Sequence, residues 1–242
     1  MYYKNKTVIM RRLLIVLCAL VMSYAVMAQG VVVTSTGERI NLPQGCKQVI
    51  VVVGTTGANC KVYKMTAEGT SRLEWRYELI EGVTGYAGIA AKDKKREGDG
   101  KTPQGLYALN SGLYYVNDFT TKFPMEQYYE RYMWDENPYS PTYNSLLHNP
   151  PPGTKGDKLW EHRNLQYRYI VVVEYNTSPA VPGKGSAIFI HAWRARGKGT
   201  AGCVGVSEQN MKRIVEWLDP DQMPHILILP KGVTVNYMLY NN

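Results

Sequence analysis

The stretch Gly185-Ser186-Ala187-Ile188-Phe189-Ile190-His191 is followed closely by Gly199-Thr200-Ala201-Gly202-Cys203-Val204-Gly205-Val206-Ser207. The first is an apolar strand that ends in a histidine, and the second is a turn of small residues that carries a cysteine. A thiol in such a turn can approach a carbonyl carbon, and a histidine on a nearby strand can hold that thiol as the thiolate. The two stretches predict a sheet-borne site for cysteine acyl transfer.

The small residues around the cysteine support this interpretation. Thr200, Ala201 and Gly202 let the backbone come close to a bound carbonyl, and the N–H groups near Cys203 can serve an oxyanion hole. A lone cysteine is more often an inert, buried small hydrophobe. The residue types alone leave both interpretations open.

The sequence on either side of residues 185–207 predicts many short strands. Apolar alternation or short apolar runs predict strands at residues 48–53, 60–65, 72–80, 86–91, 106–109, 169–175, 187–191, 225–229 and 233–238. One helix is expected directly after the cysteine. Ser207 caps it, Met211, Ile214 and Val215 form its apolar stripe, and Pro220 closes it. The fold class is therefore mainly β, sandwich-like, with one short helix.

Residues 119–164 differ from the rest of the chain. This segment is dense in tyrosine, tryptophan and proline, and it shows no clean periodicity. It is too aromatic for a disordered linker. We interpret it as an ordered insertion that walls or covers a cleft, with a structural cap far from the chemistry as the alternative.

Other binding motifs are absent or incomplete. Gly98 to Gly105 looks like a phosphate loop, but Lys95 stands where the motif needs its first glycine and no helical pattern follows. His148, His162 and His225 have no metal-ligand spacing, so we predict no metal and no cofactor. The basic run at 92–96 lacks interleaved aromatic residues, which argues against nucleic-acid binding.

The N-terminal 28 residues predict a secretory signal peptide. They carry four basic residues and no acidic one, then an apolar stretch from Leu13 to Val21, then Ala25-Val26-Met27-Ala28 at the cleavage positions. An N-terminal membrane anchor is the alternative, although the apolar stretch is short for a span. We divide the chain into a signal peptide at 1–28, a leader segment at 29–46 and one domain at 47–242. We expect export to the periplasm or cell envelope.

Charge and cysteine content fit an exported protein. Subtracting the four leader cations from the formal charge of +8 leaves +4, which suits an anionic cell wall but does not require one. After removal of the leader, Cys46, Cys60 and Cys203 remain, and an odd count leaves at least one thiol unpaired. A disulfide between Cys46 and Cys60 stays open at this stage.

Three ordered motifs together resemble one family. These are Gly185 to His191, Thr200-Ala201-Gly202-Cys203-Val204, and the upstream Gly98-Asp99-Gly100-Lys101-Thr102-Pro103-Gln104-Gly105. They resemble the L,D-transpeptidase catalytic domain of the YkuD type, over roughly residues 47–235. Trp193 and Arg194 after the histidine are similar to one branch of that family.

The resemblance implies a β-sandwich-like domain and a mechanism. Cys203 would attack the carbonyl of a peptidoglycan tetrapeptide stem and expel the terminal D-residue, and an amine of a second stem would resolve the thioester into a cross-link between third-position residues. His191 would act as base and then acid, oriented by the carbonyl of Ala192, and Gly202 with the Cys203 backbone would form the oxyanion hole. We assign Arg194, Thr200, Tyr169 and Trp193 to substrate binding. Acylation of the thiol by carbapenems is also implied.

The chain departs from the family pattern near the cysteine. The interval between histidine and cysteine box is short, Ala201 stands where many members have histidine, and Gly205 stands where many have arginine or asparagine. We expect Arg194 or Arg196 to replace that cation toward a stem carboxylate. Three functions remain: a transpeptidase, an L,D-carboxypeptidase or endopeptidase using water at the same site, and a wall-binding protein without activity.

Overall fold

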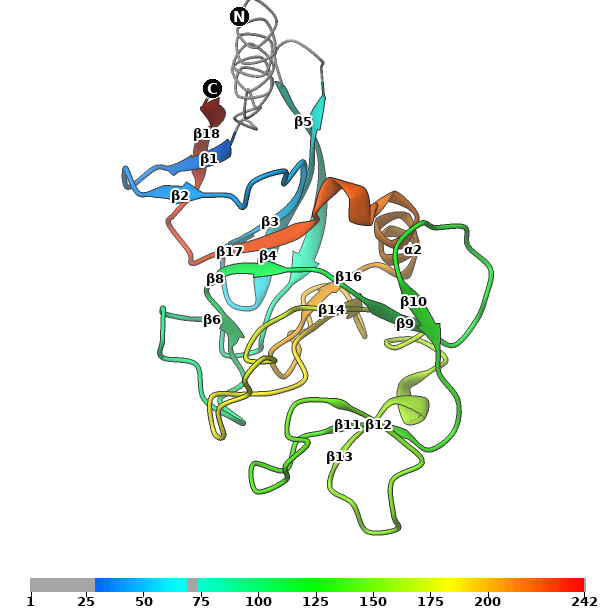
Figure 1. The fold of residues 1–242 in the computed structure, drawn as a ribbon. Coiled ribbons are helices and arrows are strands. Elements are labelled where there is room, and N and C mark those ends of the chain that lie inside the picture. The colour runs from blue at the N-terminus through cyan, green and yellow to red at the C-terminus, as the bar shows by residue number, and fades with distance from the viewer. Residues whose placement is uncertain (1–28, 69–73, 242) are drawn as a thin grey trace, which may run out of the picture.

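The computed structural model describes residues 29–68 and 74–241. The predicted signal peptide at 1–28 lies outside these ranges. The mainly β prediction is confirmed, because the described chain is built on one large curled sheet with three small sheets around it (Figure 1). No helix in the described ranges is long and apolar enough to cross a membrane.

The large sheet has ten strands in the order β10-β9-β14-β15-β16-β5-β4-β3-β17-β8. Strand β3 pairs antiparallel with β4, and β4 pairs antiparallel with β5. The strands have the following bounds: β3 Gln48–Gly54, β4 Asn59–Glu68, β5 Glu74–Val83, β8 Gly105–Ala108, β9 Gly112–Tyr114, β10 Met125–Gln127, β14 Tyr169–Val172, β15 Phe189–Ala192, β16 Val204–Val206 and β17 His225–Leu229.

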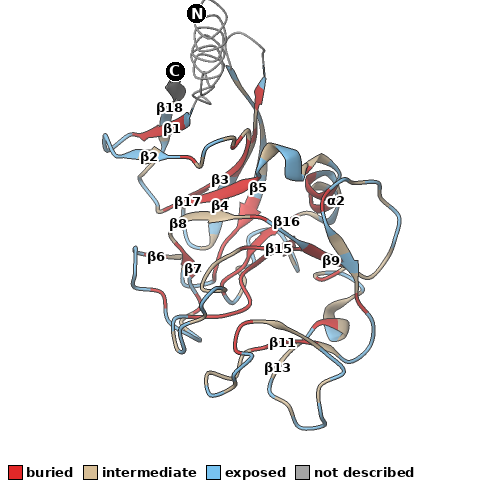
Figure 2. Cartoon of the chain, viewed as in Figure 1, coloured by how far each residue is buried: buried red, intermediate tan, exposed pale blue. Residues whose placement is uncertain are grey.

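Strands β3 and β17 of this sheet are buried on both faces (Figure 2). Successive side chains of a strand point to opposite faces, so Ile50 and Val52 enter one core cluster while Val49 and Val51 enter another. This explains why β3 is a continuous apolar run instead of an alternating one. Other elements of the chain must therefore pack on each face to exclude water.

Helix α2 (Glu208–Trp217) covers the first face (Figure 1). The predicted cap is confirmed, because the Ser207 side chain accepts a hydrogen bond from the N–H of Asn210 at 3.2 Å. Met211, Ile214 and Val215 are buried against the sheet. Two short 3-10 helices, η1 (Leu159–His162) and η2 (Pro220–Gln222), complete the helical elements of the described chain.

The segment 29–46, expected as a leader ahead of the domain, helps to cover another face. It forms β1 (Gln29–Thr34) and β2 (Arg39–Asn41), which join β18 (Val235–Asn241) in a three-stranded sheet. Val32, Leu42 and Cys46 from this segment lie in the same core cluster as Val49 and Val51. The first and last strands of the described chain thus pack together on the domain.

The two cysteines considered for a disulfide are buried in different places. Cys46 lies in the cluster under the small N-terminal sheet, and Cys60 lies in the cluster under α2. No disulfide joins them. Burial raises the pKa of each of these two thiols to about 12, which keeps both protonated at neutral pH.

Residues 119–164 form strands and a 3-10 helix. They include β10 and η1 and a separate antiparallel sheet of β11 (Tyr132–Asp135), β12 (Leu146–His148) and β13 (Gly156–Lys158), seen at the bottom of Figure 1. Tyr128, Trp134 and Leu159 are buried in a cluster that also holds Phe189 and Cys203. The insertion therefore packs directly on the strand pair that carries the predicted chemistry.

The loop at 98–105 leads into a strand, in line with the rejection of a phosphate loop. Its middle forms β7 (Thr102–Pro103), which pairs with β6 (Ile89–Ala90) in a two-stranded sheet. The chain then enters β8 directly.

Candidate active site

Two neighbouring parallel strands place His191 and Cys203 on one face of the sheet. In the β15–β16 register, Ile190 lies beside Val204 and His191 beside Gly205. Cys203, which directly precedes β16, consequently lies next to Phe189, two residues before His191. Alternation then sends the side chains of Phe189, His191 and Cys203 to the same side, away from Ile190 and Val204.

The thiol of Cys203 is buried and held by backbone groups. Its side chain is 6% exposed, it donates to the carbonyl oxygen of Ala187 at 3.2 Å, and Sγ accepts from the N–H of Phe189 at 3.3 Å. Burial raises the pKa of Cys203 to about 12, with the charges of Asp157 and Glu136 adding to the rise. The Cys203 side chain is therefore a neutral thiol at neutral pH.

His191 is equally buried and has a defined tautomer. Its Nδ1 lies 2.8 Å from the carbonyl oxygen of Ala192. A carbonyl only accepts, so Nδ1 carries the proton and Nε2 is left as the basic nitrogen. This is the orienting contact that the resemblance implied. Burial lowers the pKa of His191 to about 4, so the imidazole is neutral above that pH.

These two environments correct one expectation. The sequence led us to expect an imidazolium that holds Cys203 as the thiolate. The structure instead has a neutral thiol and a neutral imidazole, because neither charge is solvated in this buried cluster.

The turn before Cys203 is braced by two threonines. Thr200 Oγ1 donates to the carbonyl oxygen of Cys203 at 2.6 Å, and Thr102 Oγ1 donates to the same oxygen at 3.4 Å. The N–H of Gly202 donates to Thr200 Oγ1 at 3.1 Å. That N–H is therefore engaged inside the turn, and the structure does not present it as an oxyanion donor.

The glycine in this turn is needed for space. A Cβ atom on Gly202 would stand 3.1 Å from the carbonyl oxygen of Lys101 and 3.1 Å from Cδ1 of Ile188. Both contacts are tighter than ordinary packing. Gly202 thus allows the cysteine turn to lie against the 98–105 loop.

A cavity of about 500 Å³ opens over the thiol. It is lined by Tyr86, Lys95, Glu97, Gly98, Glu136, Asp157, His162, Gln166, Tyr167, Ser186, Ala187, Ile188, His191, Arg194, Lys198, Gly199, Thr200, Ala201, Gly202 and Cys203. Its size suits a peptide-sized ligand segment.

The comparison with protein-family models decides the family. The model described as the L,D-transpeptidase catalytic domain, YkuD, matches residues 30–227. The chain belongs to this family. No curated protein matches the chain. The match begins at residue 30, within β1, and so includes the segment that forms the small N-terminal sheet.

Within this L,D-transpeptidase domain, the predicted substrate-binding residues divide into two groups. Arg194 and Thr200 line the thiol cavity, and Arg194 is exposed to solvent. Trp193 lines a different cavity beside Cys60 and Arg196. Tyr169 is buried under α2, and its hydroxyl donates to Asp118. The structure therefore does not bring Trp193 and Tyr169 to the thiol.

Arg196, the other expected substitute for the missing cation, is also directed elsewhere. Its guanidinium pairs with Glu81 on β5, and both side chains are largely exposed. At Gly205 itself, a Cβ atom would stand 2.9 Å from Cγ2 of Val83 and 3.2 Å from Cβ of Trp193. The neighbouring strand and Trp193 together favour glycine at this position.

The insertion supplies an acidic wall that sequence reasoning missed. Glu136 follows β11, Asp157 lies in β13, and both line the cavity. Burial, together with the charges of Asp157 and Glu97, raises the pKa of Glu136 to about 7. The aromatic density of the insertion indicated that it packs on the domain, but no pattern marked these two carboxylates.

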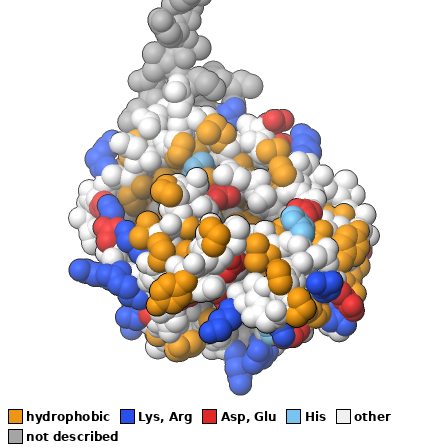
Figure 3. Space-filling view, turned by 60° about the horizontal axis from the view of Figure 1, so that its bottom comes forward, with side chains coloured by type: hydrophobic (Ala, Val, Ile, Leu, Met, Phe, Trp, Pro, Cys, Tyr) orange, Lys and Arg blue, Asp and Glu red, His pale blue; other side chains and the backbone are white. Residues whose placement is uncertain are grey.

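Basic and acidic side chains thus line the same cavity of this L,D-transpeptidase domain. Arg194 and Lys198 come from the loop between His191 and Cys203, whereas the carboxylates come from the insertion and from Glu97. Figure 3 shows the insertion side of the molecule, with Lys and Arg side chains projecting around its margin. A ligand with both an acidic and a basic group fits this distribution.

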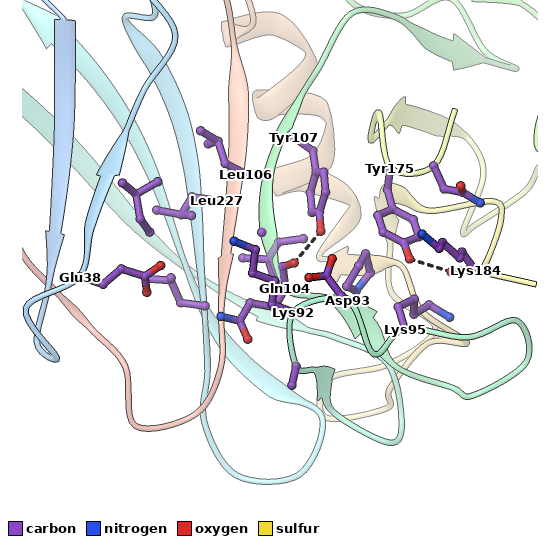
Figure 4. A pocket seen from close by; sticks show the side chains of 17 residues that line it. Glu38, Lys92, Asp93, Lys95, Gln104, Leu106, Tyr107, Tyr175, Lys184 and Leu227 are labelled. Atoms are coloured by element: carbon purple, nitrogen blue, oxygen red, sulfur yellow. Dashed lines mark hydrogen bonds between the residues drawn. The ribbon is translucent and has the colours of Figure 1, made fainter. Parts of the chain in front are cut away.

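A second cavity, of about 490 Å³, shares Lys95 with the thiol cavity (Figure 4). Leu106 and Leu227 form part of its apolar wall, and the hydroxyl groups of Tyr107 and Tyr175 are tied to backbone carbonyls. None of the predicted site residues lines it. The described residues also contain no group of three or more histidine, cysteine, aspartate or glutamate side chains arranged to hold a metal ion.

Proposed function

We propose that this protein is an exported cysteine L,D-transpeptidase that cross-links peptidoglycan stems through a thioester on Cys203. The observation that carries the proposal is the placement of His191 and Cys203 on one face of a strand pair, at a cavity of a domain from this family. The family acts on peptidoglycan stems. The leader-like pattern of residues 1–28 supports export to the periplasm or cell envelope.

The first half of the reaction forms the acyl-enzyme. As Sγ attacks the stem carbonyl, its proton passes to Nε2 of His191, and the imidazolium is oriented by the Ala192 carbonyl. The N–H of Cys203 is the candidate donor to the oxyanion, because the Gly202 N–H is engaged with Thr200. His191 then gives its proton to the leaving amine of the terminal D-residue, and the carbonyl remains bonded to sulfur.

The second half transfers the acyl group. The amine of a second stem attacks the thioester, loses a proton to Nε2 of His191, and forms the new amide bond. The released sulfur takes that proton back, so the neutral pair is restored. Water attacking the same thioester would give a carboxypeptidase or endopeptidase, which is the competing function from the sequence.

Product analysis separates these functions. The purified protein is incubated with tetrapeptide muropeptides and the products are read by mass spectrometry. We expect dimers joined through third-position residues, with loss of the terminal D-residue. Shortened monomers alone would instead identify a hydrolase, and an unchanged digest would indicate a binding protein.

Cysteine variants and a carbapenem test the assignment of Cys203 as the nucleophile. Cys203→Ala should abolish turnover, whereas Cys46→Ala and Cys60→Ala should retain it, because those thiols lie in other core clusters. A carbapenem should add its mass to the wild-type chain at Cys203 only. Turnover by the Cys203→Ala protein, or an adduct on another residue, would refute the assignment.

A further inference from the structure

Tyr167 contacts the catalytic histidine from the side of the insertion. It lies between η1 and β14, is 9% exposed, and lines the thiol cavity. Its ring meets the ring of His191 edge-on, with centroids 5.2 Å apart and planes at 80°. It also packs edge-on against Phe189 and His162. Three rings therefore fix the position of the tyrosine ring.

The insertion holds Tyr167 at both ends. The Tyr167 hydroxyl donates to Oδ2 of Asp157 on β13 at 2.5 Å. The hydroxyl of Tyr128, fully buried, donates to the Tyr167 carbonyl at 2.8 Å. One contact fixes the tip of the side chain and the other fixes the backbone, so the ring cannot move away from His191 without breaking them.

His191 needs such a support because one hydrogen bond leaves its ring free to tilt. The contact from Nδ1 to the Ala192 carbonyl sets the tautomer, but rotation about that contact would change the direction of Nε2. The Tyr167 ring packs against the imidazole at a centroid distance of 5.2 Å and so restricts this rotation. A small displacement of a catalytic group lowers the rate strongly.

We propose that Tyr167 is a positioning residue for His191, and that the insertion serves the reaction by holding Tyr167 through Asp157 and Tyr128. The insertion would then be part of the catalytic apparatus besides forming a cavity wall. The proposal rests on the proposed function, in which His191 takes the proton of Cys203.

The test uses alkylation of Cys203 by iodoacetamide, which needs no peptidoglycan substrate. A neutral, aligned His191 takes the thiol proton during attack, so the wild-type rate should change by less than about fivefold between pH 6 and pH 9. Without an aligned base the reaction needs free thiolate, whose fraction grows about tenfold per pH unit. His191→Ala defines this second profile.

Tyr167→Leu should adopt the steep profile of His191→Ala and react about tenfold or more slowly at pH 7. Tyr167→Phe keeps the ring but loses its tether, so it should react about threefold more slowly than the wild type. Asp157→Ala and Asp157→Asn both remove the charge that opposes the thiolate of Cys203, but only asparagine keeps an acceptor oxygen for the Tyr167 hydroxyl. The alanine variant should therefore react about threefold more slowly than the asparagine variant. The matched control is Tyr169→Phe, which removes another buried tyrosine–aspartate hydrogen bond, away from the cavity.

A wild-type rate and a flat profile in Tyr167→Leu would overturn the proposal. If that variant fails to fold, two other comparisons decide. A Tyr167→Phe rate equal to that of Tyr169→Phe, together with equal rates for Asp157→Ala and Asp157→Asn, would overturn the proposal. Failure of the proposed function has a different signature, because His191→Ala would then keep the wild-type profile. In that case there is no base for Tyr167 to position and the proposal falls as well.

Discussion

The Thr200 hydroxyl donates a hydrogen bond of 2.6 Å to the carbonyl oxygen of Cys203, the proposed nucleophile. The same oxygen atom of Thr200 accepts from the N–H of Gly202 at 3.1 Å. One side chain therefore closes the turn from both sides. The role of Thr200 seen here is to shape the nucleophile turn as well as to line the cavity.

Thr200→Val should consequently lower kcat about tenfold, because the unbraced turn no longer aims the thiol and its backbone N–H. Thr200→Ser keeps the hydroxyl and should stay near the wild-type value. Steady-state kinetics on a tetrapeptide donor measure both. Equal activity of the valine and serine variants would show that the hydroxyl is dispensable.

Because His191 is buried, we predict that activity persists to an unusually low pH. Burial lowers the pKa of His191 to about 4, and only the neutral imidazole can accept the thiol proton. The kcat/KM value should therefore hold as the pH falls below 6.5 and drop only near pH 4. A pH profile checks this, provided that circular dichroism shows the protein folded at each pH. A midpoint near 6.5 would contradict the neutral, buried pair.

Buried thiols predict a loss of stability in alkali. Burial raises the pKa of Cys60 from its ordinary value of 9.0 to about 12 in the folded chain, so above pH 9 the unfolded chain releases a proton that the folded chain keeps. Stability is full below pH 9 and falls as the pH rises. At pH 10 this thiol alone costs about 1.4 kcal/mol. In urea titrations, Cys60→Ala should lose less stability than the wild type between pH 8 and pH 10.

Glu136 predicts a charge effect on the nucleophile. Its pKa is raised to about 7, so its carboxylate is ionised above that pH, where its negative charge opposes the developing thiolate of Cys203. Glu136→Gln should alkylate at the wild-type rate at pH 5.5 and about threefold faster at pH 8.5. Glu161→Gln, on the exposed side of η1, is the control. A pH-independent ratio would exclude this coupling.

The strand-rich fold and the candidate pair of Cys203 and His191 could be predicted from the sequence because each depends on local pattern, and the fold is confirmed. The cap at Ser207 and the apolar stripe of α2 are also local, and both are confirmed. The neutral state of the catalytic pair is not local. It arises because Tyr128, Trp134 and Leu159, far from the motif in sequence, exclude water from Cys203.

Two neighbouring tyrosines show why the substrate-binding residues were harder to predict. Simple alternation would put Tyr167 and Tyr169 on the same face of one strand. The strand begins only at Tyr169, however, and the break before it sends Tyr167 to the thiol cavity and Tyr169 under α2. Composition could not distinguish these two rings, because the difference depends on where the strand begins.

Arg194 is the cation that we expect to bind the acyl donor. Arg194 is exposed, lines the thiol cavity, and comes from the loop between His191 and Cys203. A guanidinium there can hold a stem carboxylate, replacing the cation that many family members carry at the position of Gly205. Arg194→Ala should raise KM for the acyl donor about tenfold while leaving the iodoacetamide rate of Cys203 unchanged. Arg196→Ala is the matched control, because its guanidinium pairs with Glu81 outside the cavity. Equal KM values for the two variants would remove Arg194 from substrate binding and would leave the assignment of Cys203 and His191 intact.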